Sequence, residues 1–275
     1  MDEIFVISLP RSGSTWVSRA LAAALRTHVI NEPFNWRKHP DREKYHMRYL
    51  TAGMPDDGLG MLLPRILHHP LSLATALVGR RCQVVKDVHA CLAVEQIWER
   101  VRPKFIFLIR HPCAVAQSWA RLQYEVDFRL VRLISQDKLL EEHLAPFVSQ
   151  LTRREDYYYQ VGAFWGASYY VMNRISARHP DWVWATHEEL CNHSEERFTG
   201  LAGRLGYPPG RLGRWLLRRY IQQNDRPRRP GERIYSVKRQ STEEPGKWKT
   251  QLTEEQIRAV LDGAGPFGLL DRFFG

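Results

Sequence analysis

The segment from Ile4 to Arg26 constrains the fold of this chain more than any other. It begins with the apolar run Ile4 to Ile7, breaks at Pro10, and passes through a short loop of hydroxyl-bearing residues and glycine. It then enters a helical stretch from Val17 to Arg26. In this arrangement backbone N–H groups and a helix N-terminus converge on a phosphate or sulfate. The segment therefore predicts an anion-binding loop. The alternative is a capped helix that simply follows a buried strand.

The loop departs from the nucleoside-triphosphate pattern G-x-x-x-x-G-K-[ST] in an informative way. With Gly13 as the second glycine, the first glycine falls on Ser8 and the lysine on Ser14. In triphosphate-hydrolysing loops that lysine reaches the outer phosphates, so ordinary ATP or GTP chemistry loses its main cationic partner here. Arg11 supplies a cation from within the loop instead, and its planar guanidinium suits the oxygens of a tetrahedral anion.

The loop closely resembles the 5′-phosphosulfate loop of sulfotransferases that use 3′-phosphoadenosine-5′-phosphosulfate (PAPS). The resemblance covers Pro10-Arg11-Ser12-Gly13-Ser14-Thr15-Trp16. It implies that the 5′-phosphosulfate is gripped by Arg11, Ser12, Gly13, Ser14 and Thr15. It also implies that Trp16 stacks on or flanks the adenine, with core packing as the alternative.

A second segment matches the same family at the expected order and spacing. The apolar run from Phe105 to Ile109 predicts a buried strand; Arg110 ends it and Pro112 opens a helix. Ser118 follows Arg110 by eight residues, about two helical turns into that helix. Sulfotransferases carry a similar strand-Arg-x-Pro-x-x-x-x-x-Ser segment, which implies that Arg110 and Ser118 bind the 3′-phosphate of PAPS.

A third resemblance lies near the C-terminus. Family members often have a basic or hydroxyl-rich loop that closes over the nucleotide and ends in Gly-x-Trp-Lys, which here matches Gly246, Trp248 and Lys249. The Arg-Lys-Gly triplet of the cytosolic branch is absent. The resemblance implies cofactor contacts from Arg239 and Ser241. A solvated basic loop is the alternative.

Composition limits the partners and cofactors. The formal net charge is +10, which favours anionic ligands. Nucleic acid is not expected as a partner, because most basic residues are scattered and no nucleic-acid motif accompanies them. The four cysteines show no C-x-x-C spacing, and neither a zinc site nor a disulfide framework is indicated. Several histidines also lack metal-ligand spacing (His68, His69, His111, His143 and His187), so no metal cofactor is expected.

The chain length and the apolar runs limit the architecture and the location. At 275 residues the chain fits one sulfotransferase domain, residues 1–275. No apolar run approaches the roughly 18 residues of a membrane span, and the first strand begins at Glu3 or Ile4. We therefore expect a cytoplasmic protein without a membrane partner. The sequence leaves its oligomeric state open.

The alternation of strand-like and helical patterns predicts the fold class. Strand-like runs occur at 3–9, 28–31, 82–86, 104–109 and 182–186. Helical patterns lie near 15–27, 59–78, 90–101, 112–123, 126–150, 153–178, 194–205 and 210–223. This order predicts an α/β fold of the P-loop type in three layers, with a central parallel sheet and helices on both faces. Both anion motifs follow strands, where such sheets bind ligands.

Two regions have no usable match to the family, 37–80 and 120–178. We expect them to be helical insertions on the acceptor side. The aromatic side chains between Tyr157 and Tyr170 are expected mainly to pack in the core, and some can line an acceptor pocket.

Sulfuryl transfer to an alcohol requires an aligned nucleophile, stabilisation of developing charge and a general base. Glu32 is the first candidate base, because Glu32-Pro33-Phe34 resembles a Glu-Pro segment of carbohydrate sulfotransferases whose glutamate is proposed as the base. An ordinary loop carboxylate before a proline is the alternative. Cytosolic small-molecule sulfotransferases have Lys-Thr-His after the third strand. Lys86 matches that lysine, but the histidine, His89, arrives one residue late and Asp87 intervenes. His89 is therefore the second candidate, with Asp87 as a third.

These features together predict a PAPS-dependent sulfotransferase that acts on a hydroxyl of a small metabolite or carbohydrate and releases adenosine 3′,5′-bisphosphate (PAP). Lys86 and Arg11 are expected to stabilise the transferring group. Two alternatives remain, a P-loop kinase that uses ATP and a non-enzymatic nucleotide- or RNA-binding module. Ser14, together with the pair Arg110 and Ser118, disfavours the kinase.

Overall fold

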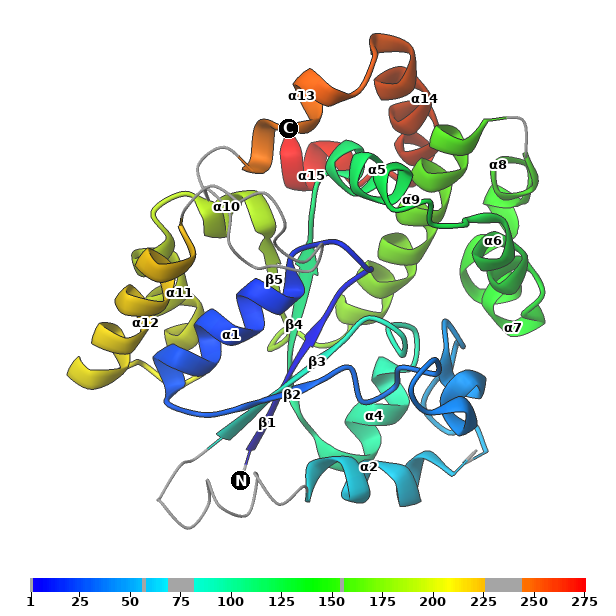
Figure 1. The fold of residues 1–275 in the computed structure, drawn as a ribbon. Helices are drawn as coiled ribbons and strands as arrows, with labels where there is room; N and C mark the ends of the chain where they lie inside the picture. Colours follow the sequence, from blue (N-terminus) through cyan, green and yellow to red (C-terminus); the bar gives the residue numbers. More distant parts are fainter. Residues whose placement is uncertain (1, 56–57, 69–81, 154–155, 226–243) are drawn as a thin grey trace.

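A parallel sheet forms the centre of the molecule (Figure 1). The computed structural model of the chain describes residues 2–55, 58–68, 82–153, 156–225 and 244–275. Within these residues the strands pair in the order β2-β3-β1-β4-β5, and every pair is parallel. They are β1 (Asp2–Ile7), β2 (Val29–Asn31), β3 (Cys82–Asp87), β4 (Lys104–Ile109) and β5 (Val183–Thr186). The five expected strands are confirmed, and β1 lies at the centre of the sheet.

The longer helices follow the strands in the alternation that the sequence predicts. They are α1 (Ser14–Leu25), α2 (Leu59–Leu67), α4 (Val94–Val101), α5 (Pro112–Arg121), α6 (Asp127–Ile134), α9 (Tyr157–Ser176), α11 (Ser194–Arg204), α12 (Arg211–Asn224) and α14 (Glu254–Ala264). The shorter helical pieces are η1 (Pro40–Tyr45), α7 (Asp137–Leu139), η2 (Leu140–Leu144), η3 (Ala145–Phe147), α8 (Val148–Thr152), α10 (His187–Cys191), η4 (Glu244–Gly246), α13 (Trp248–Gln251), η5 (Gly265–Phe267) and α15 (Leu270–Phe274). No helix in the described ranges is long and apolar enough to cross a membrane.

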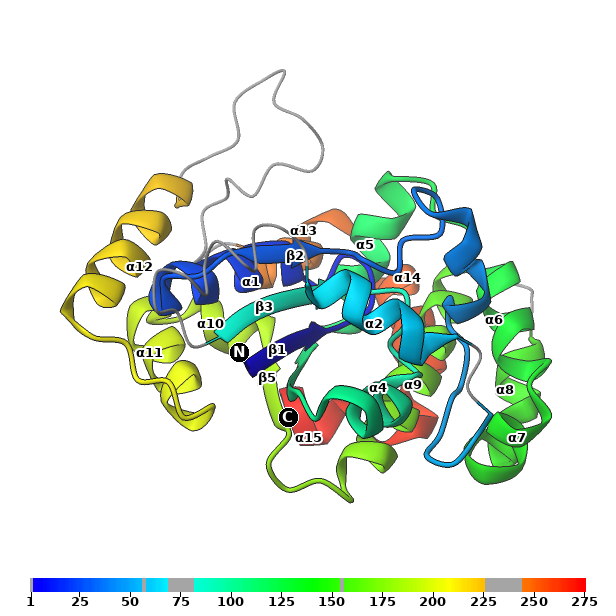
Figure 2. The ribbon, with the colours of Figure 1, turned by 90° about the horizontal axis from the view of Figure 1, so that it is seen from below.

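The two faces of the sheet are covered by different helices, as the side-chain alternation of β1 requires. Ile4 and Val6 pack in a cluster with residues of α1, α11 and α12. Phe5 and Ile7 point to the other face, where they join residues of α4, α5 and α9. Figures 1 and 2 show α11 and α12 beside α1 on one side of the sheet, with α4 and α9 on the other. The expected three-layer α/β fold is thus confirmed.

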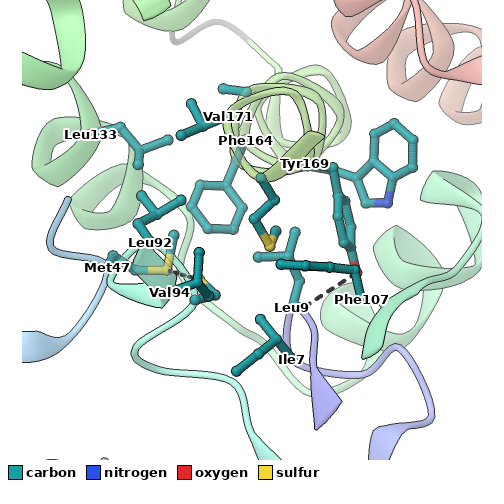
Figure 3. Packing of buried hydrophobic residues seen from close by; sticks show 14 of the residues in the cluster. Ile7, Leu9, Met47, Leu92, Val94, Phe107, Leu133, Phe164, Tyr169 and Val171 are labelled. Carbon is teal, nitrogen blue, oxygen red and sulfur yellow. Dashed lines mark hydrogen bonds between the residues drawn. The ribbon is translucent and has the colours of Figure 1, made fainter. Parts of the chain in front are cut away.

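The larger cluster connects the sheet to the loops that bear the expected site. Leu9, directly after β1, packs with Phe107 of β4 and Tyr169 of α9 (Figure 3). Met47 and Leu92 belong to the same cluster and come from the segments that follow β2 and β3. The carboxyl ends of the strands are therefore anchored on one continuous apolar core.

The region 126–150 differs from the single helical pattern seen in the sequence. Helix α6 ends at Ile134, and the chain resumes as the short pieces from α7 to α8. Gln136 has an extended backbone at the break, and its side chain accepts a hydrogen bond from the amide of Tyr49 and donates one to the carbonyl of Met47. Those bonds tie the break to the segment after η1. Pro146 cannot donate a backbone hydrogen bond to a continuing helix.

Candidate functional site

The loop between β1 and α1 has the backbone conformation of an anion cradle. Arg11 and Gly13 have positive φ angles, 72° and 85°. A Cβ atom added to Gly13 would overlap the imidazole of His187, which closes over the loop from the end of β5. Position 13 therefore requires glycine for two reasons, its left-handed backbone and the close approach of the ring.

The N-terminus of α1 offers donors to a ligand. Gly13 provides no side-chain cap, and among the described residues the amides of Ser14 and Thr15 have no hydrogen-bond acceptor. Uncapped amides at the start of a 12-residue helix suit an anion, because the helix dipole adds to the hydrogen bonds. The loop thus fits the 5′-phosphosulfate that the sequence predicts for it.

Aromatic side chains hold this loop in place. The hydroxyl of Tyr169 accepts a hydrogen bond from the amide of Leu9 at 3.2 Å (Figure 3). It also donates one to the carbonyl of Leu108 at 2.9 Å and lies 3.0 Å from the Ser12 hydroxyl. The indole of Trp119 donates to the carbonyl of Pro10 at 3.0 Å. The hydroxyl of Ser12 is fully buried against Tyr169 and supports the loop from behind.

The two anion motifs meet in space. The Nε of Arg11 donates to the Ser118 hydroxyl at 3.0 Å, and Nη1 of Arg110 donates to the Arg11 carbonyl at 3.2 Å. Arg110 follows β4, the neighbour of β1, and both its side chain and that of Ser118 are nearly buried. The indole of Trp165 in turn donates to the Arg110 carbonyl at 2.9 Å. The segments that the sequence assigns to the two ends of PAPS are therefore adjacent.

A cavity of about 580 Å³ opens beside the loop. Its walls come from the loop and α1, from the segments after β2 and β3, from α10 and from the region of α6. The expected site residues that line it are Arg11, Gly13, Ser14, Thr15, Trp16, Glu32, Lys86 and His89. Ser12, Arg110 and Ser118 do not line it. Trp16 meets His187 and Phe198 edge-on, so it both packs in the core and faces the cavity.

Glu32 and Lys86 form an ion pair at the cavity wall. The second carboxylate oxygen of Glu32 accepts a hydrogen bond from the Asn35 amide at 2.9 Å and lies 4.0 Å from Nε2 of His89. Burial raises the pKa of Glu32, but the Lys86 charge and the hydrogen bonds from Lys86 and Asn35 outweigh it, so the pKa lies below the usual range. Glu32 is therefore an anion held in a fixed position.

His89 contacts a second histidine that the sequence did not single out. Its Nδ1 lies 3.3 Å from Nδ1 of His46, so one ring donates and the other accepts. Burial lowers the pKa of His89 and lowers that of His46 to about 3, and the positive charge of Arg129 lowers both further. Both rings are therefore neutral near pH 7.

Asp87 has a structural position instead of a place in the cavity wall. Its side chain is fully buried, and its carboxylate oxygens accept hydrogen bonds from the amides of Phe34, His89 and Ala90 at 2.7 to 3.0 Å. These bonds join the loop after β2 to the loop after β3, and so they bring Glu32 to the same wall as His89.

The C-terminal segment is only partly described. Trp248 stacks on His111, the residue after Arg110, with ring centroids 4.4 Å apart and planes 11° from parallel. The Gly-x-Trp-Lys ending therefore lies beside the second anion motif. Arg239 and Ser241, the expected cofactor contacts of this loop, lie outside the described residues.

Several cavity residues were missed by sequence reasoning, among them Arg19, Arg37, His46, Tyr124 and Arg129. Apart from Arg19, which follows the anion loop in α1, they come from segments without a family motif. The contact of His187 with the anion loop was also missed, although its ring covers Gly13. Within the described ranges no group of three or more His, Cys, Asp or Glu side chains is arranged to hold a metal ion.

The chain is similar to solved structures of sulfotransferases. No protein-family model matches the chain, and no curated protein matches it. Among solved structures, the mouse sulfotransferase SULT7A1 in complex with PAP matches with a TM-score of 0.50 and 13% identity, over 99% of this chain and 89% of the other. This chain has the fold of the sulfotransferases.

Two further structures resemble the chain. The sulfotransferase domain from the curacin biosynthetic pathway matches with a TM-score of 0.48 and 17% identity, over 94% of this chain and 96% of that domain. Retinol dehydratase, in complex with androsterone and the inactive cofactor PAP, matches with a TM-score of 0.46 and 15% identity, over 99% and 82%. Within the sulfotransferase fold of this chain, the two expected anion motifs occupy the carboxyl ends of the adjacent strands β1 and β4.

Proposed function

We propose that this protein transfers a sulfuryl group from PAPS to a hydroxyl of a small-molecule or carbohydrate acceptor. The observation that supports this most strongly is the contact of the two anion motifs, in which the Arg11 side chain reaches Ser118 and Arg110 reaches the Arg11 backbone. A single phosphate needs one such motif, whereas a nucleotide with phosphates on both ends of its ribose needs two neighbouring ones. The sulfotransferase fold supports the same conclusion.

The donor site is formed by the chain's own donors and cations. The amides of Ser14 and Thr15 and the guanidinium of Arg11 face the 5′-phosphosulfate, and Arg110 and Ser118 hold the 3′-phosphate. Trp16 flanks the adenine. PAPS supplies the sulfuryl group when it is bound, and PAP is the product. Lys86 turns partly away from Glu32 toward the donor. There it neutralises the negative charge that develops on the oxygen between sulfur and phosphorus.

Glu32 acts as the general base in this proposal. The acceptor hydroxyl forms a bond to sulfur as the bond from sulfur to the 5′-phosphate oxygen breaks, and the hydroxyl proton passes to the Glu32 carboxylate. Asn35 holds that carboxylate at 2.9 Å, and the cavity gives the acceptor access to it. When Lys86 turns toward the donor, the Glu32 carboxylate loses its largest stabilising charge and becomes more basic.

A second candidate for the base is His89, and a specific observation favours it. The ring is neutral near pH 7 and lines the same cavity, so it can accept a proton directly.

The cavity wall also includes Arg37 and His46 from the region 37–80, and Tyr124 and Arg129 from the region 120–178. This supports the proposal that both regions form the acceptor side of one domain.

The proposal is tested in two steps. Calorimetric titration with PAP, and separately with ATP and magnesium, should show tight binding of PAP alone. A mass-spectrometric screen of hydroxyl compounds with PAPS should then detect addition of a sulfo group. Tighter binding of ATP than of PAP would contradict the proposal and favour a kinase. Steeply salt-dependent oligonucleotide binding without sulfo transfer would favour a nucleic-acid-binding module.

A further inference from the structure

A buried arginine that forms no ion pair with any described carboxylate lines the acceptor end of the cavity. Arg129, on α6, is only 7% exposed. Its guanidinium lies over three rings, at 4.3 Å from the centroid of Phe128, 5.0 Å from Trp119 and 5.7 Å from Tyr124. One of its N–H groups donates to the carbonyl of Glu125. These contacts fix the position of the guanidinium but do not neutralise its charge.

Within the described ranges, no carboxylate forms an ion pair with Arg129, although the Glu125 charge acts on it from beyond ion-pair distance. Arg132, one turn later on the same helix, shows the contrast: it pairs with Glu43 at 4.0 Å and donates to the Glu43 carbonyl at 2.7 Å. Burial lowers the pKa of Arg129 to about 10, so the side chain remains cationic at neutral pH. A buried cation without an ion-pair partner is costly, and a bound anion would reduce that cost.

The surroundings of Arg129 reinforce its positive charge. Arg37 and Lys38, both exposed, line the mouth of the same cavity, and the Arg37 charge acts on Arg129. Among the described residues of the cavity wall, Glu32 is the only carboxylate, and it is already paired with Lys86. The acceptor end therefore holds more positive than negative charge before any ligand enters.

The charge of Arg129 is also felt by the candidate bases. It contributes to the lowered pKa of both His46 and His89. Arg129 thus lies within electrostatic reach of the wall where the acceptor hydroxyl would be deprotonated. The anion loop of the donor site reaches the cavity from a different element, the segment between β1 and α1.

We infer that the acceptor carries an anionic group, a carboxylate or a sulfate or phosphate ester, that pairs with the guanidinium of Arg129. Arg37 at the mouth adds a second, solvent-exposed attraction. The hydroxyl to be sulfated lies toward Glu32 and His89, so the acceptor has its anionic group and its reacting hydroxyl at separate positions. This inference rests on the proposed function, because it names the class of acceptor for the same site.

Matched pairs of acceptors test the inference. Each pair consists of a carboxylate and the matching neutral carboxamide, for example D-glucuronate with D-glucuronamide and 4-hydroxybenzoate with 4-hydroxybenzamide. Sulfate and phosphate monoesters of hydroxyl compounds are tested in the same way. Sulfo transfer from PAPS should have a kcat/KM at least tenfold higher for the anionic member of pairs that react. Arg129→Gln should reduce that preference to less than threefold. Arg37→Gln should reduce the preference by about threefold. Because Arg37 is exposed, this variant tests the inference if Arg129→Gln does not fold.

The control variant is Arg132→Gln, on the same helix but outside the cavity wall, which should keep the wild-type preference. The Kd of PAP should stay within twofold in Arg129→Gln. A rise of tenfold or more would overturn the inference by assigning Arg129 to the donor. Preference for the neutral members, or an equal loss for both members in Arg129→Gln, would also overturn it.

A binding measurement separates this inference from the proposed function. The protein saturated with PAP is titrated with the carboxylate and the carboxamide of each pair, and binding is followed by calorimetry. If no compound is sulfated but carboxylates bind more tightly in an Arg129-dependent manner, the proposed reaction fails and the anion site stands. If compounds are sulfated without any dependence on charge, the reaction stands and the anion site fails.

Discussion

The Nε of Arg11 and the hydroxyl of Ser118 are 3.0 Å apart, although the two residues are separated by 107 positions in the sequence. Arg11 belongs to the loop after β1, and Ser118 belongs to α5, which follows β4. Because β1 and β4 are neighbours in the sheet, their carboxyl ends bring these segments together. The bond fixes the guanidinium of Arg11 against α5, and so a change at Ser118 affects both anion motifs.

Substitution of Ser118 should therefore weaken PAP binding. In Ser118→Ala the Arg11 guanidinium loses the Ser118 acceptor, and the ligand loses a hydroxyl donor. A hydrogen bond to a charged group contributes about 1.5 kcal/mol or more, so the Kd of PAP should rise about tenfold. Calorimetric titration measures it. Ser149→Ala, on an exposed helical serine, is the matched control and should leave the Kd unchanged. An unchanged Kd in Ser118→Ala would exclude Ser118 from the donor site.

Gly13→Ala should lower the unfolding free energy more than Gly268→Ala, although both glycines have a left-handed backbone. Gly13 and Gly268 both have positive φ, 85° and 66°. An added Cβ meets the His187 ring at position 13 and nothing within 4 Å at position 268. Left-handed backbone costs a non-glycine residue about 1 to 2 kcal/mol, so Gly268→Ala should lose about that much unfolding free energy and Gly13→Ala distinctly more. Urea unfolding measures both.

A double variant isolates the cause of that difference. In Gly13→Ala with His187→Ala, the overlap with the ring is removed and only the backbone strain remains. Relative to His187→Ala alone, the added cost of the Gly13 substitution should fall to that of Gly268→Ala. If the cost of Gly13→Ala is the same with and without the His187 ring, the contact between the two residues does not determine the requirement for glycine.

The elements with a strong local pattern could be predicted from the sequence. The strand runs are apolar and bounded by turn residues, so their existence could be predicted, and their alternation with helical patterns predicted a parallel sheet. The anion loop after β1 has a sequence motif. The order of the strands in the sheet was not predicted. The break after α6 could not be predicted, because it depends on Gln136 bonding to Tyr49 and Met47 at a distance of nearly 90 positions. Periodicity records only local preference, and tertiary bonds override it.

The acceptor side of the site shows the same limit. Neither Arg129 nor His46 lies in a sequence motif, and the role of each is visible only from its neighbours in the structure. Arg129 lies against aromatic rings, and His46 contacts the ring of His89. Tyr169 was expected to pack in the core, and it does, but its hydroxyl also fixes the anion loop. A single sequence indicates which residues are apolar or charged but not which distant backbone atoms they meet.

Removal of the Glu32 charge should reduce turnover and leave the donor site intact. In Glu32→Gln the acceptor proton has no carboxylate to receive it, and general-base catalysis typically contributes about 10² to 10⁴ in rate. The Kd of PAP should change by less than about threefold, since Glu32 is outside the donor motifs. Single-turnover kinetics with PAPS measures the rate. Glu43→Gln, which alters a carboxylate paired with Arg132 outside the cavity, should turn over like the wild type.

The pH dependence of the rate distinguishes Glu32 from His89. The pKa of Glu32 is lowered in the free protein by Lys86, so its carboxylate should stay ionised there to below about pH 4.3, and kcat/KM should hold until then. A loss of rate that begins above pH 5 and persists in Glu32→Gln would identify His89 as the base.

The stability of the protein should depend on pH through His46. Burial lowers its folded-state pKa to about 3, whereas an unfolded histidine titrates near 6.5. Below about pH 6.5 the unfolded chain therefore binds a proton at this position that the folded chain does not, and the contribution of His46 to stability is progressively lost down to about pH 3. The slope is at most about 1.4 kcal/mol per pH unit, or about 2 kcal/mol between pH 6.5 and pH 5.

In His46→Gln this part of the dependence should vanish, so that urea unfolding at a series of pH values gives a shallower curve. Trp36→Phe, which changes a ring packed on His46 without removing the imidazole, should shift the curve but keep the wild-type slope. Parallel curves for His46→Gln and the wild type would mean that the buried ring is not the group that makes folding sensitive to acid.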